Sequence, residues 1–410
     1  MKCTVLTVGT EILFGSIVNT NSVFISQQLQ ELGIDVMYHM SVGDNPVRLK
    51  EMLAHAYLDC DMVITTGGLG PTQDDLTKEM ICEYFGERNV EFPEEMRKVE
   101  AFFEKSGRKM TENNRKQAFF PEHAETLANP NGTAPGFWLN KNGKIIISMP
   151  GPPSEMRPMM VNEVRPRLLA MQDAALYSRN IMTYDIGESA LETELLEFID
   201  GQTDPTLATY AGTFQCKLRI TSKRKTLKEA QAAVDDMTSR VCAKIPDNIY
   251  SIDGEELPAV VLRMLKEKGL TLSACESCTG GMFAAAVTDV PGASEVFDRS
   301  LVTYTERAKM EELGVSPKTL EEFSAVSART AEEMAEGLHR ASGSDVCVSV
   351  TGYAGPTGGT EEDPVGTFYV GLYHDGRCTA QRFTTRRPTR MRVREYAVLQ
   401  MFLRIYKALK

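Results

Sequence analysis

The sequence has no long apolar run and no long basic run, and each absence excludes a class of protein. A membrane-spanning helix needs about 20 mostly apolar residues in succession. A nonspecific nucleic-acid binder concentrates lysine and arginine on one surface. Here 45 Lys and Arg stand against 56 Asp and Glu, which gives a net charge of −11. We therefore expect no membrane anchoring and no nucleic-acid partner, whereas small anionic ligands held by a few local donors remain compatible with this charge.

The sequence also lacks a paired cysteine framework. Its nine cysteines are an odd number, and the opening segment MKCTVLTVGTEIL lacks the charged and then apolar build of a secretory signal. Both features favour reduced thiols in a cytoplasmic protein. One close pair, Cys275 and Cys278, has the C-x-x-C spacing of redox motifs. A redox function is disfavoured because it does not need Ser277 or the Thr-Gly-Gly that follows, and a zinc site because no second pair or histidine cluster accompanies it.

With 410 residues, the chain is too long for one ordinary core, and its pattern changes twice. Strands and helices alternate over residues 1–168 and again over 253–410, whereas 169–252 has the pattern of a small α+β unit. In the first block we expect strands at 4–8, 34–40, 62–65 and 143–149, helices at 21–32, 47–58 and 77–85, and a polar stretch over 86–118. In the last block we expect strands at 270–275, 345–350 and 366–373 and helices at 257–267, 328–341 and 389–408. The fold class is therefore α/β, with parallel sheets that bind ligands beyond the carboxyl ends of their strands.

A glycine-rich loop, GGLGPT, follows a buried strand in the first block. Glycines at such a place let the backbone wrap round a phosphate, but neither a Walker A loop nor a GxGxxG fingerprint is present. Asp74 and Asp75 come next and would repel a phosphate unless a divalent cation or a proton intervened. The alternative is helix capping, because the helix dipole favours acids in the first turn. We expect Asn19, Thr20, Asn21, Asp44 and the loop of residues 131–136 at the same rim.

In the last block, a strand breaks into a turn within LTLSACESCTGGMF, residues 270–283. Ser277 lies at this turn, and the Thr-Gly-Gly after it lets a helix begin. Free N–H groups at a helix start stabilise negative charge, so a hydroxyl there would lie beside an oxyanion site. The alternative is an ordinary strand–turn–helix junction with Ser277 as a helix cap.

A second segment, residues 302–309, supplies a candidate base. Thr305 predicts the N-cap of a helix that Gly314 ends, which makes Tyr304 and Lys309 the N′ and N4 positions, and these touch across a helix start. A buried Lys309 amine could lose its proton near neutral pH and serve as the base for Ser277. The alternative is that its stem packs on the tyrosine ring while the amine meets solvent. The glycine-rich stretch 351–360 follows another strand and is either a ligand loop or a flexible surface loop.

The first half of the chain resembles a known fold. VGTEILFGSIVNTNS, TTGGLGPTQDDLTKE, NGTAPGF and MPGPPSEM resemble the molybdopterin-binding fold of the MoaB/MogA type and, more closely, the N-terminal domain of the CinA family. The resemblance implies a metal-dependent ADP-ribose pyrophosphatase, with a divalent cation of unspecified identity near Asp44 and Asp75. The ligand-binding residues that we assign to this domain are Asn19, Asn21, Gly67, Gly68, Gly70, Pro71, Thr72 and Asp75. The middle segments DIGESALETEL and LRITSK resemble the family's KH-type unit, but no RNA binding is expected because the chain is acidic and no GXXG clamp is evident.

The last domain resembles the CinA C-terminal domain, a nicotinamide mononucleotide deamidase of pyridine nucleotide salvage. ESCTGG, Tyr304 with Lys309, and TGYAGPTGGT carry the likeness. It implies Ser277 as nucleophile, Lys309 as base and Tyr304 as the residue that orients or relays the proton, with no cofactor. The substrate-binding residues assigned to this domain are Thr279, Gly280, Gly281, Thr351, Gly352 and Arg390.

The family resemblance also implies a homodimer that acts on two small nucleotides, nicotinamide mononucleotide and ADP-ribose. The chain departs from the family's usual residues at Arg299-Ser300, Glu306 and Asp363. Glu306 and Asp363 place negative charge where an anionic substrate would approach. The alternative function is a non-catalytic nucleotide- or molybdopterin-binding protein with one or both sites degenerate.

Overall fold

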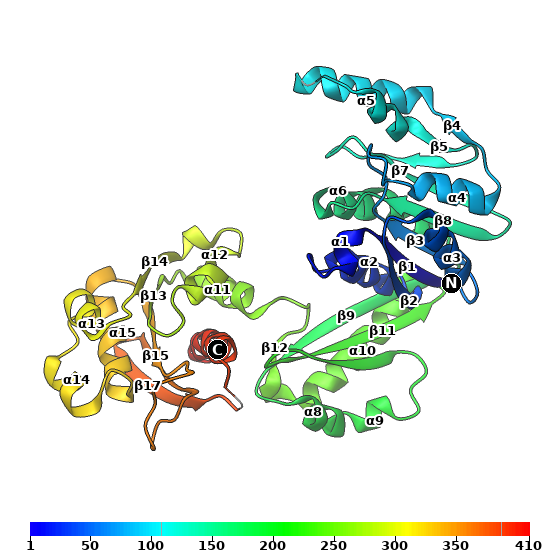
Figure 1. The fold of residues 1–410 in the computed structure, drawn as a ribbon. Coiled ribbons are helices and arrows are strands. Elements are labelled where there is room, and N and C mark those ends of the chain that lie inside the picture. The colour runs from blue at the N-terminus through cyan, green and yellow to red at the C-terminus, as the bar shows by residue number, and fades with distance from the viewer. Residues whose placement is uncertain (108, 387) are drawn as a thin grey trace. The chain divides into compact units, whose positions relative to one another are not determined.

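The computed structural model describes residues 1–107, 109–386 and 388–410. The chain forms two compact units, one of Met1–Ser178 with Ser222–Ala232 and the other of Arg179–Thr221 with Ala233–Lys410. Figure 1 traces the chain through both. Within the described ranges, no helix is long and apolar enough to cross a lipid bilayer.

The first unit contains a six-stranded sheet of mixed direction. Its order is β2 (Asp35–Val42), β1 (Lys2–Val8), β3 (Met62–Thr66), β8 (Lys144–Met149), β7 (Gly136–Lys141) and β6 (Glu125–Leu127). The first four strands are parallel, as the alternating pattern predicts, and β7 and β6 add an antiparallel edge. The helices are α1 (Thr10–Leu13), α2 (Thr20–Glu31), α3 (Pro46–Ala56), α4 (Thr77–Phe85), α6 (Pro153–Met159), a π turn (Met160–Val164) and α7 (Arg165–Ala170).

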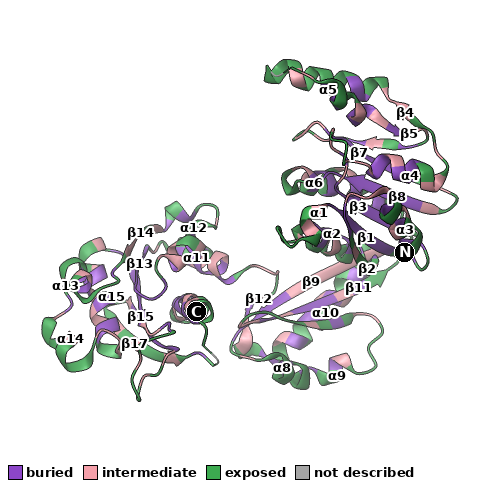
Figure 2. Ribbon diagram, viewed as in Figure 1, coloured by how far each residue is buried: buried purple, intermediate pink, exposed green. Residues whose placement is uncertain are grey.

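Both faces of this sheet are covered, because its central strands are apolar at successive positions. Val5 and Ile64 belong to one buried cluster with residues of α2, α6 and α7. Leu6 and Val63 point to the other face, where α3 and α4 contribute to a second cluster. Figure 2 shows the buried central strands. This burial on both faces explains why the strands are continuous apolar runs.

The stretch 86–118, expected as polar connection, contains regular structure. It forms β4 (Asn89–Glu91), α5 (Pro93–Ser106), a 3₁₀ helix (Glu112–Ala118) and β5 (Phe119–Pro121), with β4 and β5 paired antiparallel. Helix α5 begins with proline at its first position and ends at Gly107 in the left-handed region. It buries Met96 and Val99 and leaves most of its charged residues exposed.

The middle of the chain has α+β structure, as expected. Its four-stranded sheet has the order β10 (Thr206–Ala211), β11 (Cys216–Arg224), β9 (Ala175–Thr183) and β12 (Ile249–Ser251). The helices of this segment are α8 (Glu188–Glu194), α9 (Leu196–Ile199) and α10 (Leu227–Lys244), followed by a 3₁₀ turn (Pro246–Asn248).

The last sheet carries the candidate Ser277 site. Its order is β14 (Phe297–Val302), β13 (Leu272–Glu276), β15 (Val346–Gly352), β16 (Thr367–His374) and β17 (Arg377–Thr384), of which the first three are parallel and the last two antiparallel. The helices are α11 (Leu257–Lys268), α12 (Met282–Thr288), α13 (Glu306–Leu313), α14 (Pro317–Phe323), α15 (Ala328–Ser342) and α16 (Arg390–Leu409), with a 3₁₀ turn (Ala293–Glu295). Ala274 packs with α11, α12 and α16 on one face, and Cys275 packs with α13 and α15 on the other.

Candidate functional site

Ser277 lies at the carboxyl end of β13, where the strand turns into α12. Its backbone N–H donates to the carbonyl of Val350 at 3.1 Å, so the neighbouring strand β15 fixes its position. Gly280 and Gly281 follow with φ of 58° and 93°, in the left-handed region that favours glycine. The predicted strand–turn–helix junction is therefore present, and Ser277 is buried within it.

Lys309 reaches Ser277 from α13. Its Nζ donates to Oγ of Ser277 at 3.1 Å and to the carbonyl oxygen of Thr303 at 2.8 Å, and the residue is only 1% exposed. Burial lowers the pKa of the Lys309 amine below its ordinary value. The predicted cap is confirmed, because the side chain of Thr305 accepts from the N–H of Ala308 and the helix ends at Gly314. The fold thus places a buried amine with a lowered pKa within hydrogen-bond distance of a hydroxyl.

The side chain of Tyr304 does not share the partner of Lys309. It is 57% exposed, and its hydroxyl accepts from Nη2 of Arg390 at 3.0 Å. The same guanidinium donates through Nη1 to the carbonyl of Gly355 at 2.8 Å. The hydrogen bonds of Tyr304 and Lys309 therefore go to different partners, and the structure supports a Lys309–Ser277 pair more directly than a Lys309–Tyr304 pair. Arg390, Tyr304 and the Gly355 loop come together as one group.

Glu276 is the residue of this site that sequence reasoning missed. Its side chain is fully buried, and Oε2 accepts from the N–H groups of Gly281 and Phe283 at 3.0 and 3.1 Å. Oε1 accepts from the N–H of Ala284 at 3.0 Å and from the hydroxyl of Ser300 at 3.2 Å. One carboxylate thus accepts hydrogen bonds from the backbone N–H groups at the start of α12 and ties this helix to β14. The helix dipole also favours a negative charge at the start of α12.

This arrangement corrects the expected oxyanion site. The N–H of Gly281 is bound by Glu276, and the N–H of Gly280 donates to the carbonyl of Ser277 at 3.2 Å. Two N–H groups of this turn, those of Gly280 and Gly281, are therefore already engaged. The local sequence could not reveal this, because the competing acceptor is a side chain that folds back from the preceding strand.

Two buried hydroxyls beside the Ser277–Lys309 pair lack a hydrogen-bond partner within the part of the chain that the structure describes. They belong to Thr279 and Thr303. The carbonyl of Thr279 accepts from Nη2 of Arg394 at 2.7 Å, and that of Thr303 holds Lys309. Buried polar groups are normally paired, so these two hydroxyls point to a ligand with donors or acceptors of its own.

Two residues assigned to substrate binding have structural partners instead. The hydroxyl of Thr351 donates to the carbonyl of Ala325 at 2.7 Å, which fixes the connection between α14 and α15. At Gly352, an added Cβ would lie 2.4 Å from Cβ of Phe368, so close packing between strands requires glycine there. These contacts explain why a threonine and a glycine occupy these positions without reference to a substrate.

The departures from the family's usual residues also have structural partners. Ser300 donates to Glu276, as described above. Asp363 forms an ion pair with Arg382 at 2.8 Å and accepts from the hydroxyl of Tyr369. The negative charge expected to oppose an anionic substrate is therefore offset at Asp363, whereas Glu306 is exposed in the first turn of α13.

The C-x-x-C thiols are unsuited to redox chemistry. Cys275 and Cys278 are both buried free thiols. Burial raises the pKa of Cys278 to about 12 and raises the pKa of Cys275 well above its ordinary value. Because the thiolate is the reactive form, both cysteines behave as small apolar core residues.

The glycine-rich loop of the first unit lines a cavity of about 470 Å³. At Gly67, φ is 106° and an added Cβ would lie 2.0 Å from the carbonyl oxygen of Val8, so only glycine fits between β1 and the loop. The predicted residues that line this cavity are Gly67, Gly68, Gly70, Pro71, Thr72, Asp44, Asp74, Asp75, Thr133 and Ala134. The structure therefore brings the glycine-rich loop and the predicted acids together.

Asp44 and Asp75 each accept two hydrogen bonds from a threonine through one carboxylate oxygen. In each residue, Oδ2 accepts from the N–H and hydroxyl of one threonine: Thr10 for Asp44, at 3.0 and 2.7 Å, and Thr72 for Asp75, at 2.9 and 2.6 Å. Over residues 1–107, 109–386 and 388–410, no group of three or more His, Cys, Asp or Glu side chains could hold a metal ion. Asp44 and Asp75, which both line the cavity, thus each have one carboxylate oxygen engaged by a threonine.

Asn19 and Asn21 lie in a smaller neighbouring cavity of about 60 Å³, which adjoins the first along Val8, Glu11 and Gly151. The side chain of Asn19 caps α2 and donates to the hydroxyl of Thr7. Nδ2 of Asn21 donates to Thr66 and to the carbonyl of Gly151. The hydrogen bonds of both residues thus tie the chain together at the ends of β1 and β3.

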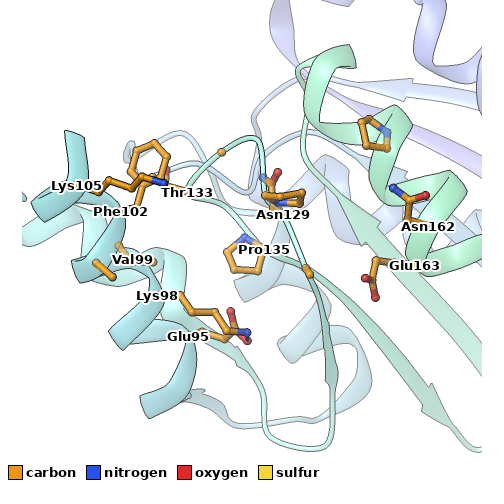
Figure 3. Close-up of a pocket in the computed structure, with 15 residues that line it drawn as sticks. Glu95, Lys98, Val99, Phe102, Lys105, Asn129, Thr133, Pro135, Asn162 and Glu163 are labelled. Atoms are coloured by element: carbon orange, nitrogen blue, oxygen red, sulfur yellow. Dashed lines mark hydrogen bonds and ion pairs between the residues drawn. The ribbon is translucent and has the colours of Figure 1, made fainter.

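Figure 3 shows a third cavity, of about 460 Å³, between α5 and the loop of residues 129–136. Val99 and Phe102 of α5 and Pro135 of the loop line it, and Thr133 lines both this cavity and that of the glycine-rich loop. The amide of Gln117 donates to the hydroxyl of Thr133 at 3.0 Å. The unexpected helix α5 therefore makes a wall of both charged and apolar side chains next to the glycine-rich loop.

Comparison with known proteins matches three family models in order. "Probable molybdopterin binding domain" matches residues 4–170, "Damage-inducible protein CinA KH domain" 178–251 and "CinA C-terminal domain" 254–409. A relative from Acetivibrio thermocellus, named for competence-damage induction, is 44% identical over 98% of this chain and 97% of its own. A CinA-like protein from Dictyoglomus turgidum is 44% identical over 92% of both chains. A solved CinA superfamily structure from Klebsiella pneumoniae is 33% identical over 37% of this chain and 95% of its own, with a TM-score of 0.36.

Proposed function

This chain belongs to the CinA family, and from that premise we propose that its C-terminal domain hydrolyses the carboxamide of nicotinamide mononucleotide to nicotinate mononucleotide and ammonia. The observation that carries the proposal is the hydrogen bond between Ser277 and the buried amine of Lys309. A hydroxyl needs a base to become a nucleophile, and a desolvated lysine is one of the known partners.

In the proposed reaction, Lys309 in its neutral form takes the proton of the Ser277 hydroxyl while Oγ attacks the carboxamide carbon. The N–H groups of Cys278 and Thr279 stabilise the oxyanion. The protonated amine then donates to the leaving nitrogen, the C–N bond breaks, and ammonia departs from an acyl ester on Ser277. Water activated by the same amine hydrolyses this ester and regenerates the enzyme.

The substrate's phosphate and ribose need donors outside this pair. Arg390 supplies a guanidinium held between Tyr304 and Gly355, and bidentate guanidinium contacts suit a phosphate. The unpaired hydroxyls of Thr279 and Thr303 lie closer to the reacting carboxamide. We assign Tyr304 to orient Arg390 and the substrate, and no cofactor is needed for this reaction.

A pH profile tests Lys309 as the base. Only the neutral amine accepts a proton, and burial lowers its pKa. The kcat/KM for nicotinamide mononucleotide should therefore rise with pH to a plateau, with its midpoint below the ordinary lysine value of about 10.4. Ammonia release measured from pH 6 upward checks this expectation. A profile without an inflection below that value would contradict the assignment.

For the N-terminal domain, we propose hydrolysis of the pyrophosphate of ADP-ribose. The cavity that joins the glycine-rich loop to Asp44, Asp74 and Asp75 supports it. A divalent cation bound there would neutralise phosphate charge, with Asp44 and Asp75 as its protein ligands. The alternative, a non-catalytic molybdopterin- or nucleotide-binding domain, is supported by the threonine contacts that already engage both aspartates.

Metal removal distinguishes a metal-dependent pyrophosphatase from a non-catalytic binding domain. ADP-ribose hydrolysis should fall by at least about 100-fold in chelator and return when a divalent cation is added in excess. Asp75→Asn should lower activity at saturating metal, whereas Ser277→Ala, in the other domain, should leave it unchanged. Full ADP-ribose hydrolysis in chelator would rule out the metal requirement.

We also propose a homodimer. The stretch from the end of α1 into the first turn of α2 exposes several large apolar side chains, and exposed apolar surface is typical of protein–protein interfaces. They are Leu13, Phe14, Ile17, Val18 and Val23. Sedimentation of Phe14→Asp/Val18→Asp should show a monomer where the natural chain sediments as a dimer.

A further inference from the structure

The second unit contains a cavity of about 560 Å³ that none of the proposed reactions uses. Its walls are the turn between β10 and β11, the segment before α8, the end of β17 and one face of α16. Small-molecule sites commonly measure about 300 to 1,000 Å³. The volume of this cavity is that of a ligand site, so the lining side chains decide which ligand fits.

Two arginines give the cavity its charge. Arg386 and Arg392 both line it, and the guanidinium of Arg392 lies 5.0 Å over the ring of Phe214. A guanidinium held over an aromatic ring is pre-organised and presents its N–H groups to an anion such as phosphate. Of the two acids in the lining, Asp185 is paired with Lys407 at 2.6 Å, and Glu188 lies at the start of α8. Among the described residues that line the cavity, the two arginines therefore outweigh the one carboxylate that forms no ion pair, that of Glu188.

The apolar wall is aromatic. Phe214 packs on Tyr396 with ring centroids 4.7 Å apart, and both residues line the cavity. The hydroxyl of Thr385 also lines it, is buried, and lacks a hydrogen-bond partner in the described part of the chain. Aromatic walls accept the flat face of a base, and an unpaired buried hydroxyl needs a polar group from a ligand.

We infer that this cavity binds a nucleoside phosphate, with its phosphate on Arg386 and Arg392 and its base against Phe214 and Tyr396. Glu188 is positioned to accept from ribose hydroxyls. The site is separate from that of Ser277, because α16 directs Arg390 to Tyr304 and Arg394 to the carbonyl of Thr279, whereas Arg392 and Tyr396 line the cavity. Residues two apart on a helix lie on nearly opposite faces.

The test titrates the full-length protein with AMP, adenosine and inorganic phosphate in separate calorimetric experiments. AMP has no carboxamide, so the result does not depend on the deamidase proposal. The dissociation constant of AMP should be below about 1 mM. Arg386→Ala/Arg392→Ala should remove one class of AMP sites or weaken it at least about tenfold, because charge-assisted hydrogen bonds to phosphate are lost. Adenosine and phosphate should each bind at least about tenfold more weakly than AMP.

Arg377→Ala is the matched control, since it removes an exposed arginine from the opposite end of β17. Phe214→Leu keeps an apolar side chain and should weaken the binding of AMP and adenosine more than that of phosphate, because phosphate loses only the ring that orients Arg392. Thermal unfolding verifies that each variant is folded. Identical AMP isotherms for the natural chain and the double arginine variant would overturn the proposal, and phosphate binding as tight as AMP would reduce the cavity to a simple anion site.

Discussion

Replacing Lys309 by alanine is expected to abolish ammonia release from nicotinamide mononucleotide nearly as completely as replacing Ser277. The amine lies 3.1 Å from Oγ of Ser277 and is buried away from water that could substitute for it. Without that base the hydroxyl stays protonated and is a weak nucleophile. We expect kcat to fall by at least about 1,000-fold in each single variant, measured as ammonia released under saturating substrate.

The double variant decides between two functions of Lys309. Members of one catalytic unit are not additive, so Ser277→Ala/Lys309→Ala should be little slower than either single variant. Cys278→Ala is the control, because its buried thiol has no part in the proposed reaction and most activity should remain. Losses that multiply in the double variant would mean that Lys309 binds substrate and is not the base.

Replacing Glu276 by alanine is expected to destabilise the C-terminal domain by about 3 to 5 kcal/mol. Four donors lose their acceptor at once: the N–H groups of Gly281, Phe283 and Ala284 and the hydroxyl of Ser300. The N–H of Phe283 would remain buried without an acceptor, and the other three donors are half-buried. Glu276→Gln keeps one acceptor oxygen and should cost about 1 to 3 kcal/mol.

The effect of Glu276 is measured best by thermal unfolding and by amide exchange at the start of α12. Because the chain has more than one domain, a single unfolding free energy is not defined, and the transition that loses α12 protection is the relevant one. Glu321→Ala, which removes an exposed carboxylate from α14, should leave that transition unchanged. Unchanged protection of α12 in Glu276→Ala would show that this carboxylate does not hold the turn.

Local patterns were sufficient to predict most of the central strands and helices, and one of the two residues in each contact. The turn at Ser277 and the cap at Thr305 follow from residues within a few positions of each other, where glycine and threonine have strong conformational preferences. The proximity of Lys309 to Ser277 followed partly from the helix start and mainly from family resemblance. The structure supplies the missing link, because β13 and β14 are parallel neighbours whose carboxyl ends meet.

Contacts between distant segments could not be predicted in this way. Glu276 reaches across to Ser300, and Arg390 reaches Tyr304, which lies 86 positions earlier in the chain. Nothing in either local sequence indicates these partners. Helix α5 was missed for a different reason: its charged residues dominate the composition, although Met96 and Val99 have the spacing of a buried helical face.

The central claim is that Ser277 forms an ester with the nicotinoyl group, and mass spectrometry of an acid-quenched reaction tests it most directly. After mixing with excess nicotinamide mononucleotide, the peptide that contains Ser277 should carry the mass of a nicotinate mononucleotide acyl group at that serine. The adduct should be absent in Ser277→Ala and should accumulate little in Lys309→Ala. An adduct on Cys278, or full-rate ammonia release by Ser277→Ala, would contradict the account.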